Sequence, residues 1–172
     1  MIRLCRRAAL AFAVVLLPSA ALAQILTEAD GPNWQEDEIE FPPIPQEENL
    51  HEFFVTAASP NTFLIDESSI TVGEDRVVRY VLIVRTPGGA ENITYEGIRC
   101  TTGEVRIYAH GRSDEWRPAR RGGWKRLQPS GYNMPRAVLA IQHFCDGPAP
   151  PRSRQHALQG LYHGTGMPTE ND

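Results

Sequence analysis

The sequence predicts a single α+β domain in which a C-terminal helix packs on an antiparallel β-meander. The first observation is the apolar, β-branched run 77–84, which is typical of a strand covered on both faces. Residues 85–90 contain Pro-Gly-Gly and predict a turn, and 91–100 form a second β-type run that ends on a cysteine. The second observation is the close spacing of further β-type runs, which favours a meander. The third is the helical apolar periodicity of 136–144.

Shorter runs flank this central hairpin. Residues 51–57 and 62–66 are β-type and are separated by Ser-Pro-Asn, which predicts a turn. Residues 67–75 are interpreted as a link into the central strand. After the hairpin, 105–110 alternates apolar and polar residues, as a strand with one solvated face does.

The C-terminal part predicts a loop or loose hairpin over 114–128, followed by a helix over 136–144. Pro135 suits the helix start, and Asp146-Gly147-Pro148 ends the helix. The expected apolar side of the helix consists of Val138, Ile141 and Cys145, flanked by Ala137 and Phe144.

Residues 1–23 have the pattern of an export signal. Three arginines precede the apolar run 8–17, and Ala21-Leu22-Ala23 matches a cleavage site, so the mature chain is expected to begin at Gln24. The apolar run is too short for a permanent membrane span, so a periplasmic or secreted protein is expected. The predicted organisation is a signal peptide at 1–23, an acidic Pro-rich arm at 24–49, one α+β domain at 50–146, and a flexible Pro/Gly-rich tail at 147–172 with a possible short helix at 154–161.

Charge is segregated along the 172-residue chain. Without residues 1–23, 14 basic residues remain (17 less three) against 21 acidic ones, a net charge of −7. Residues 27–52 hold nine acidic residues and no Lys or Arg, whereas 99–136 are rich in arginine. Such segments attract one another within a chain or attract separate partners.

The prolines of the arm exclude a regular helix, and its acidity argues against a core. Trp34, Phe41 and Ile44 are spaced apolar anchors. One interpretation is a disordered lead-in. The other is that residues 34–48 lie across the domain and shield four basic side chains, Arg117, Arg120, Arg121 and Lys125.

Cys100 and Cys145 are the cysteines that remain after processing. In an exported chain they predict a disulfide between the end of the hairpin and the end of the helix. A catalytic thiol or a metal pair is the alternative, but no histidine or further cysteine stands at ligand spacing.

The segment 112–126 is the candidate binding surface. Arginine interleaved with tryptophan can hold an anionic polymer or a glycan through charge and stacking. The alternative is that the tryptophans cap the sheet while the arginines are solvated or pair with the acidic arm. The candidate ligand-binding residues are Arg112, Trp116, Arg117, Arg120, Arg121, Trp124 and Lys125.

No catalytic motif and no metal-ligand spacing is present, so no catalytic residue, metal or cofactor is assigned. The five histidines are interpreted as surface or packing residues. We expect a non-catalytic envelope-associated protein whose partner is an envelope polymer or another periplasmic protein; a net acidic exported chain argues against nucleic acid. The alternative is an exported enzyme acting on an envelope polymer, which requires distant residues such as Glu96, Arg99 and His110 to converge.

One run, Tyr95–Cys100 after Gly89-Ala90-Glu91-Asn92, is specific enough to suggest a family. It is accompanied by Glu48–Leu50, Phe53–Ala58, Phe63–Asp66, Ser69, Val77–Tyr80, Tyr108 and Ala109. With these residues, the sequence between Trp34 and Cys145 resembles the cryptic neisserial protein-like family, small exported proteobacterial proteins of unknown function. The resemblance implies no activity or cofactor. A weaker similarity, Ile65-Asp66-x-x-Ser69 before two strands and a cysteine, is to the surface-adhesin protein E fold, a bent antiparallel sheet with a helix and a disulfide.

Overall fold

The computed structural model describes residues 31, 33–112, 114–120 and 122–164, so the predicted export signal at 1–23 lies outside the described residues. Within these ranges seven strands form one antiparallel sheet in which β1 to β6 follow chain order, while β7 pairs with β5. The predicted antiparallel meander with a packed C-terminal helix is therefore confirmed. The strands are β1 (Leu50–Glu52), β2 (Thr62–Val72), β3 (Val77–Arg85), β4 (Glu91–Arg99), β5 (Glu104–Arg112), β6 (Glu115–Pro118) and β7 (Lys125–Arg126).

The predicted central hairpin is β3 and β4, which pair in unbroken register from Val77 opposite Arg99 to Arg85 opposite Glu91. Gly89 takes a positive φ of 81° in the connecting turn, a conformation that glycine adopts at little cost. Seven consecutive residues of β3 are buried, as expected of a strand covered on both faces.

β2 continues to Val72, beyond the predicted strand 62–66, and it changes register against β3 between Asp66 and Thr71. Side chains satisfy the backbone where the ladder breaks. Ser69 Oγ donates to the Asp66 carbonyl at 2.7 Å and accepts from the Val81 N–H at 2.8 Å. The predicted link is therefore an irregular strand, because hydroxyl and carboxylate groups replace the missing ladder bonds.

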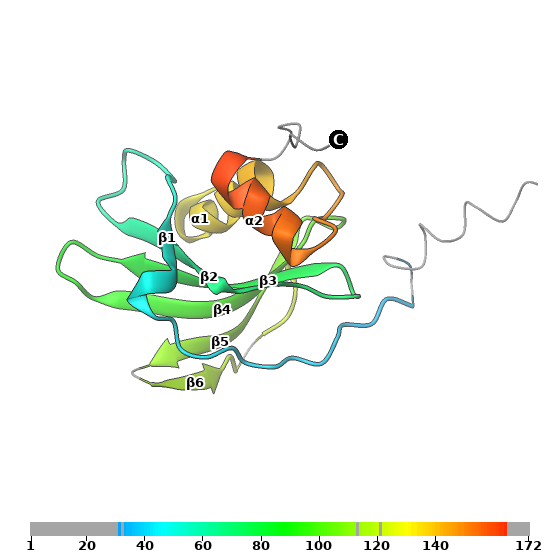
Figure 1. Ribbon diagram of the computed structural model, residues 1–172, viewed down its shortest axis with the longest axis horizontal. Coiled ribbons are helices and arrows are strands. Elements are labelled where there is room, and N and C mark those ends of the chain that lie inside the picture. The colour runs from blue at the N-terminus through cyan, green and yellow to red at the C-terminus, as the bar shows by residue number, and fades with distance from the viewer. Residues whose placement is uncertain (1–30, 32, 113, 121, 165–172) are drawn as a thin grey trace, which may run out of the picture.

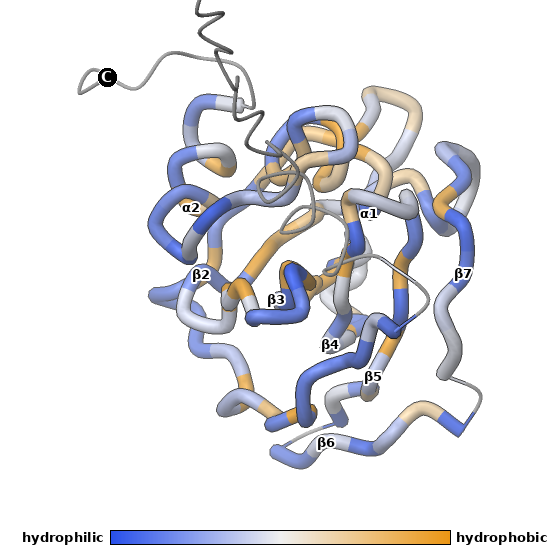
Figure 2. The backbone as a smooth tube through the Cα atoms, turned by 90° about the vertical axis from the view of Figure 1, so that its right-hand side faces the viewer, coloured by the Kyte–Doolittle hydropathy of each residue, from blue (hydrophilic) through white to orange (hydrophobic). Residues whose placement is uncertain are grey.

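Helices cover one face of the sheet (Figure 1). They are α1 (Met134–Val138), the π-helix η3 (Leu139–Phe144) and α2 (Arg154–His163), with short 3-10 turns η1 (Glu47–Asn49) and η2 (Gly131–Asn133). Figure 2 shows hydrophobic positions concentrated in the central strands and the helices above them. Ile141, expected on the apolar side, is instead 65% exposed, because the wider π turn rotates it away while Phe144 and Cys145 remain buried.

The segment expected as a flexible tail contributes α2 to the core. The Ser153 hydroxyl caps the helix by accepting the His156 N–H at 3.2 Å. Ala157 and Leu161 are buried in the cluster beneath the helices. Gly160 allows close approach, since a Cβ there would overlap the His143 carbonyl.

The predicted Cys100–Cys145 disulfide is confirmed, with a Cα–Cα distance of 5.5 Å. It joins the end of β4 to the end of η3. In the described ranges no helix is long and apolar enough to span a membrane, and no three His, Cys, Asp or Glu side chains cluster as metal ligands would.

Residues 33–46 of the acidic arm run under the sheet, on the face opposite the helices (Figure 1). Residues 34–46 form neither helix nor strand. A second hydrophobic cluster lies between this face and the arm. It consists of Leu64, Val81, Ile83, Tyr95, Tyr108 and Ala109, with Ile39, Leu50, Ile93 and Trp116 packed against it.

Candidate functional site

Three aromatic side chains from neighbouring strands form what we call the aromatic face: Tyr95 of β4, Tyr108 of β5 and Trp116 of β6. The ring centroids of Tyr95 and Tyr108 lie 5.4 Å apart, and those of Tyr95 and Trp116 lie 6.1 Å apart. The absence of a side chain at Gly97 makes room for the Tyr108 ring. A Cβ on Gly97 would lie 2.9 Å from Tyr108 Cε2 and closer still to the Tyr108 hydroxyl.

The arm lies on the aromatic face through Phe41 and Pro42. The Trp116 indole N–H donates to the Pro42 carbonyl at 2.6 Å. The Phe41 ring lies 6.2 Å from Tyr95 in an edge-to-face arrangement and 6.4 Å from Trp116. Phe41 is 43% exposed, so edge contacts between rings and one indole hydrogen bond, rather than deep burial, fix the position and the direction of the arm.

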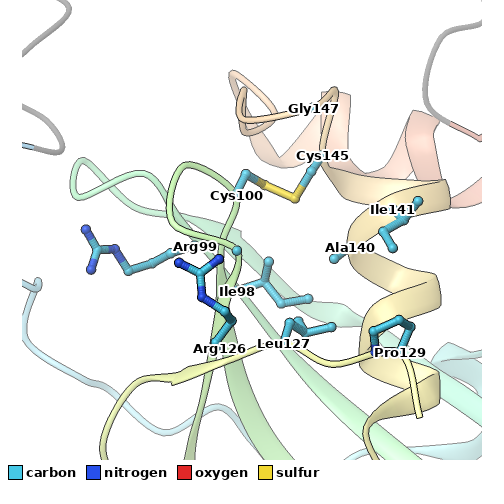
Figure 3. Close-up of a pocket in the computed structure, with 11 residues that line it drawn as sticks. Ile98, Arg99, Cys100, Arg126, Leu127, Pro129, Ala140, Ile141, Cys145 and Gly147 are labelled. Atoms are coloured by element: carbon cyan, nitrogen blue, oxygen red, sulfur yellow. A yellow bond between two sulfur atoms is a disulfide. The ribbon is translucent and has the colours of Figure 1, made fainter.

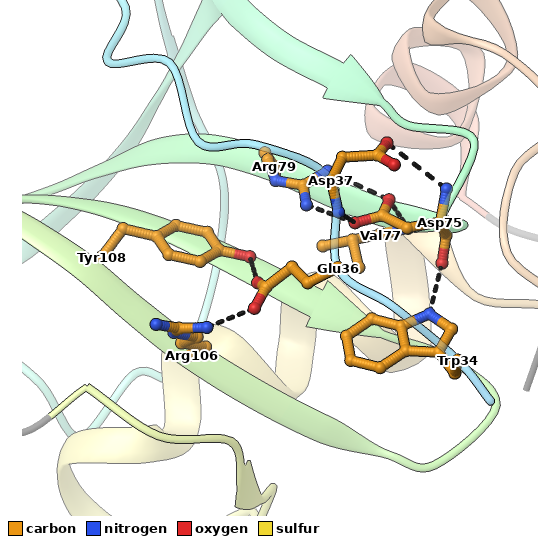
Figure 4. A network of polar contacts seen from close by, with 8 residues as sticks. All are labelled: Trp34, Glu36, Asp37, Asp75, Val77, Arg79, Arg106 and Tyr108. Atoms are coloured by element: carbon orange, nitrogen blue, oxygen red, sulfur yellow. Dashed lines mark hydrogen bonds and ion pairs between the residues drawn. The ribbon is translucent and has the colours of Figure 1, made fainter. Parts of the chain in front are cut away.

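Glu36 anchors the arm electrostatically (Figure 4). Its carboxylate pairs with the Arg106 guanidinium and accepts the Tyr108 hydroxyl at 2.7 Å. Burial, together with the neighbouring Glu36 carboxylate, raises the pKa of the Tyr108 phenol well above its usual range, so the hydroxyl stays a donor.

A second anchor surrounds the buried Asp75 in the turn before β3 (Figure 4). Asp75 pairs with Arg79, and its carboxylate accepts the Asp37 N–H at 3.0 Å. The Trp34 indole donates to the Asp75 carbonyl at 3.0 Å. Burial disfavours the charged carboxylate, but the Arg79 hydrogen bond and two backbone N–H groups outweigh burial and hold the pKa of Asp75 below its ordinary value.

Arg99 joins this end of the arm to the segment before β7. Its guanidinium lies 3.7 Å from the Trp34 ring centroid and 5.6 Å from that of Trp124. Trp34 and Trp124 also meet edge to face at 6.0 Å. A cation between two indoles stabilises the contact beyond the apolar area that it buries.

The low pKa of Asp75 predicts acid sensitivity of the arm. A carboxyl whose folded pKa lies below its unfolded pKa stabilises the fold above the unfolded value, about 3.9, and this contribution is lost as pH falls through the folded pKa. Asp75→Asn should therefore be less stable than wild type at pH 7, with the difference shrinking below about pH 4. Urea unfolding between pH 7 and pH 2 measures the difference, and a difference independent of pH contradicts the assignment.

The close approach at Gly97 predicts an overpacking effect. Gly97→Ala should lower the free energy of unfolding by about 1–3 kcal/mol, because Tyr108 must move away from Glu36. Gly123→Ala is the control, since its Cβ would meet nothing within 4 Å and the effect should stay within about 0.5 kcal/mol. Equal urea midpoints for the two variants would refute this role for Gly97.

The predicted binding segment falls into two groups in the structure. Trp116 and Trp124 are half-buried against the arm, as the capping alternative described. The basic residues Arg112, Arg117, Arg120, Lys125 and Arg126 are exposed, and we call them the cationic margin. Arg121 lies outside the described residues. Arg117 lies in β6, and Lys125 and Arg126 form β7. Figure 2 shows both strands at the margin of the molecule.

The described part of the arm lies across the domain, but among the described residues no ion pair joins it to the exposed cations of the basic segment. Its carboxylates pair with Arg106 through Glu36 and with Arg85 through Glu47. Arg117 instead pairs with Glu115, two residues away on the same strand. The arm crosses the sheet face, whereas the cationic margin lies at the sheet edge, so removal of the arm is not expected to uncover these cations.

Glu96, Arg99 and His110, the residues considered for an enzyme, do not converge. Glu96 is fully buried on the helix side, where its carboxylate pairs with the buried Arg136 and accepts the Tyr80 hydroxyl at 3.1 Å. Arg99 stacks on the arm side, and His110 is exposed. The Glu96 carboxylate is held in a structural ion pair.

Sequence reasoning missed the anchors of the arm and the buried ion pair. The available signal was a charged residue inside an apolar run: Arg79 within β3, Glu96 within β4 and Arg136 at the helix start. A charge in a strand covered on both faces requires a counter-ion, and the sequence contains several candidate partners for each charge.

A cavity of about 270 Å³ lies beside the disulfide, between the end of β4, the segment after β7 and η3 (Figure 3). Its wall is mainly apolar, including Ile98, Leu127 and Ala140, and Arg126 of the cationic margin also lines it. Drug-sized ligands occupy pockets of roughly 300–1,000 Å³, so this cavity suits only a small apolar group.

The chain resembles known proteins across most of its length. It is 25% identical over 140 residues to cryptic neisserial protein 1 from Neisseria gonorrhoeae (strain ATCC 700825 / FA 1090), covering 72% of this chain and 69% of that protein. No solved structure matches the chain, so the similarity to the surface-adhesin protein E fold stays a prediction. The model of the CNP1-like family matches residues 29–162, which include most of the arm, the whole sheet and nearly all of α2. The chain belongs to the CNP1-like family.

Proposed function

We propose that this protein is an exported, periplasmic, non-catalytic protein of the bacterial envelope that binds an anionic polymer through the cationic margin. The signal pattern at 1–23 supports export, and the Cys100–Cys145 disulfide suits an oxidising compartment.

One observation carries the binding proposal: the exposed cations of the margin line the sheet edge formed by β6 and β7 along β5, in an otherwise acidic protein. Residues 24–172 carry a net charge of −7. Five of their 14 basic residues nevertheless belong to the margin. The tryptophans of the same segment hold the arm, so the margin binds through charge and hydrogen bonding rather than stacking. Guanidinium groups suit carboxylate, sulfate and phosphate groups because their donors match two oxygens at once.

Dextran sulfate is a suitable probe, and neutral dextran is its control. Arg120→Ser with Lys125→Ser should weaken binding several-fold at low salt, because both side chains belong to the margin. Arg152→Ser with Arg154→Ser removes the same charge from exposed positions near α2 and should leave binding almost unchanged. Binding should fall steeply as salt rises, since exposed charges are screened over about 8 Å at physiological ionic strength.

Two results oppose the proposal. Equal weakening by the two double variants shows attraction to total charge rather than to the margin. Equal binding of neutral dextran shows that charge is not recognised.

A further inference from the structure

The contact between the arm and the aromatic face has the chemistry of peptide recognition, which the polymer proposal does not use. The prolines Pro42, Pro43 and Pro45 hold φ near −65°, and residues that precede proline favour extended backbone. The segment 41–45 is therefore close to a polyproline II helix, which needs no partner for its own backbone bonds.

The aromatic face meets this segment as domains that bind proline-rich peptides do. Such domains lay an extended proline-containing segment over an aromatic surface and hold its carbonyl groups with side-chain donors. Here the Trp116 indole N–H reaches the Pro42 carbonyl, while Tyr95 and Trp116 contact the ring of Phe41.

A cationic site five residues earlier in the arm sets its register. Arg106 and Tyr108 hold the Glu36 carboxylate, and Phe41 follows five residues later. Because Glu36 and Phe41 are five residues apart, the carboxylate contact and the aromatic contact recognise one ligand at two separate points. The ligand that fits carries a carboxylate five residues before an aromatic-proline pair.

The tether of the arm allows the site to be vacated. η1, which joins the arm to β1, contains no buried residue. Its ion pair from Glu47 to Arg85 is exposed, and exposed pairs hold a segment weakly. Residues 34–46 pair with no strand, so rotation at η1 can lift the arm off the aromatic face without breaking the backbone ladder of β1 to β6.

We propose that the aromatic face is a binding site for an acidic, proline-containing extended segment of a partner protein, which takes the place of residues 36–45. The tethered arm competes as an internal ligand at an effective concentration of about 1 mM. A partner at lower concentration must therefore bind more tightly than the arm does, which makes the site selective.

The test uses the full chain, folded with the arm in place. A protease site inserted between Gln46 and Glu47, which are both exposed, allows the arm to be cut after folding. On dilution the fragment should leave while the sheet and the disulfide stay intact, as circular dichroism reports. A labelled synthetic peptide of residues 33–46 should then bind the nicked protein 1:1 with a micromolar dissociation constant, and should bind the uncut protein far less.

Variant peptides distinguish specific recognition from nonspecific binding. Glu36→Gln, and Pro42→Ala with Pro43→Ala, should each weaken binding at least about fivefold, the effect expected from losing one good hydrogen bond or the preorganised backbone. Gln35→Ala, at an exposed position, should leave affinity unchanged. Trp116→Phe in the nicked protein should weaken its binding of the wild-type peptide by a similar factor.

Three outcomes overturn the proposal. In the first, the nicked protein unfolds when the fragment leaves, which makes the arm an integral part of the core. In the second, the variant peptides bind as well as the wild-type peptide. In the third, the intact protein forms dimers by exchange of arms at micromolar concentration, which assigns the site to a second copy of this chain.

Discussion

Replacement of Arg136 by methionine is expected to lower the free energy of unfolding by about 3–5 kcal/mol, the largest effect of a single substitution in this protein. Arg136 and Glu96 are essentially fully buried and pair with each other. Methionine fills similar space but leaves the Glu96 carboxylate buried without its cation.

Arg85→Met is the matched control, since Arg85 forms exposed ion pairs with Glu47 and Glu91, and it should cost only about 0–1 kcal/mol. Adding Glu96→Gln to Arg136→Met should restore part of the stability, because no unpaired charge then remains. Urea unfolding gives all these values. Equal losses for the two Arg→Met variants, or a further loss on adding Glu96→Gln, would show that the ion pair is not the cause.

Removal of the disulfide by Cys100→Ala with Cys145→Ala is expected to cost about 2–5 kcal/mol. The bridge closes a loop of sequence separation 45, for which the chain-entropy model gives about 4 kcal/mol. The site of the bridge adds to its importance, because it ties the end of β4 to the helical layer that covers the core.

Reduction of the wild-type protein is the control for this double variant, since it breaks the same bond without changing a side chain at either position. The two treatments should shift the urea midpoint by similar amounts. A double variant within about 1 kcal/mol of the oxidised wild type would show that packing alone holds the helical layer in place.

The local part of the fold could be predicted because its signals lie within a few residues of one another. The hairpin of β3 and β4 follows from two β-type runs around Pro-Gly-Gly, and the helix at 134–144 follows from its proline start and its periodicity. The disulfide could be predicted because Cys100 and Cys145 are the two cysteines outside the predicted signal at 1–23, and two cysteines allow one pairing.

The deviations arise where tertiary contacts override a local pattern. β2 continues past its predicted end because Ser69 bonds the backbone of β3, a partner 12 residues away. Ile141 is exposed because η3 is a π-helix, and a period of 3.6 residues cannot foresee the wider turn. α2 is too short and too polar to be recognised as a core element, yet it buries Ala157 and Leu161.

The residues of the candidate site could be predicted from the sequence, but the ion pairs between them could not. The arm, its apolar anchors and the two tryptophans were identified, and they do meet. Their ionic partners were misplaced, because Arg106 and Arg117 are equally basic in sequence and only the sheet shows which of them faces the arm. Arg106 lies beside Tyr108 on the covered face, while Arg117 lies on the edge strand β6.

The central claim, that the arm is bound on the aromatic face, is tested most directly by hydrogen exchange of the indole N–H groups. The chain has three tryptophans, so a nitrogen-correlated spectrum shows three indole signals, which Trp→Phe variants assign. The Trp116 indole is bonded to Pro42 of the arm, and the Trp34 indole of the arm is bonded to Asp75. We predict that both exchange much more slowly than free tryptophan at pH 7, and that both lose protection together on acidification. Exchange of both at the rate of free tryptophan at pH 7 would contradict the account.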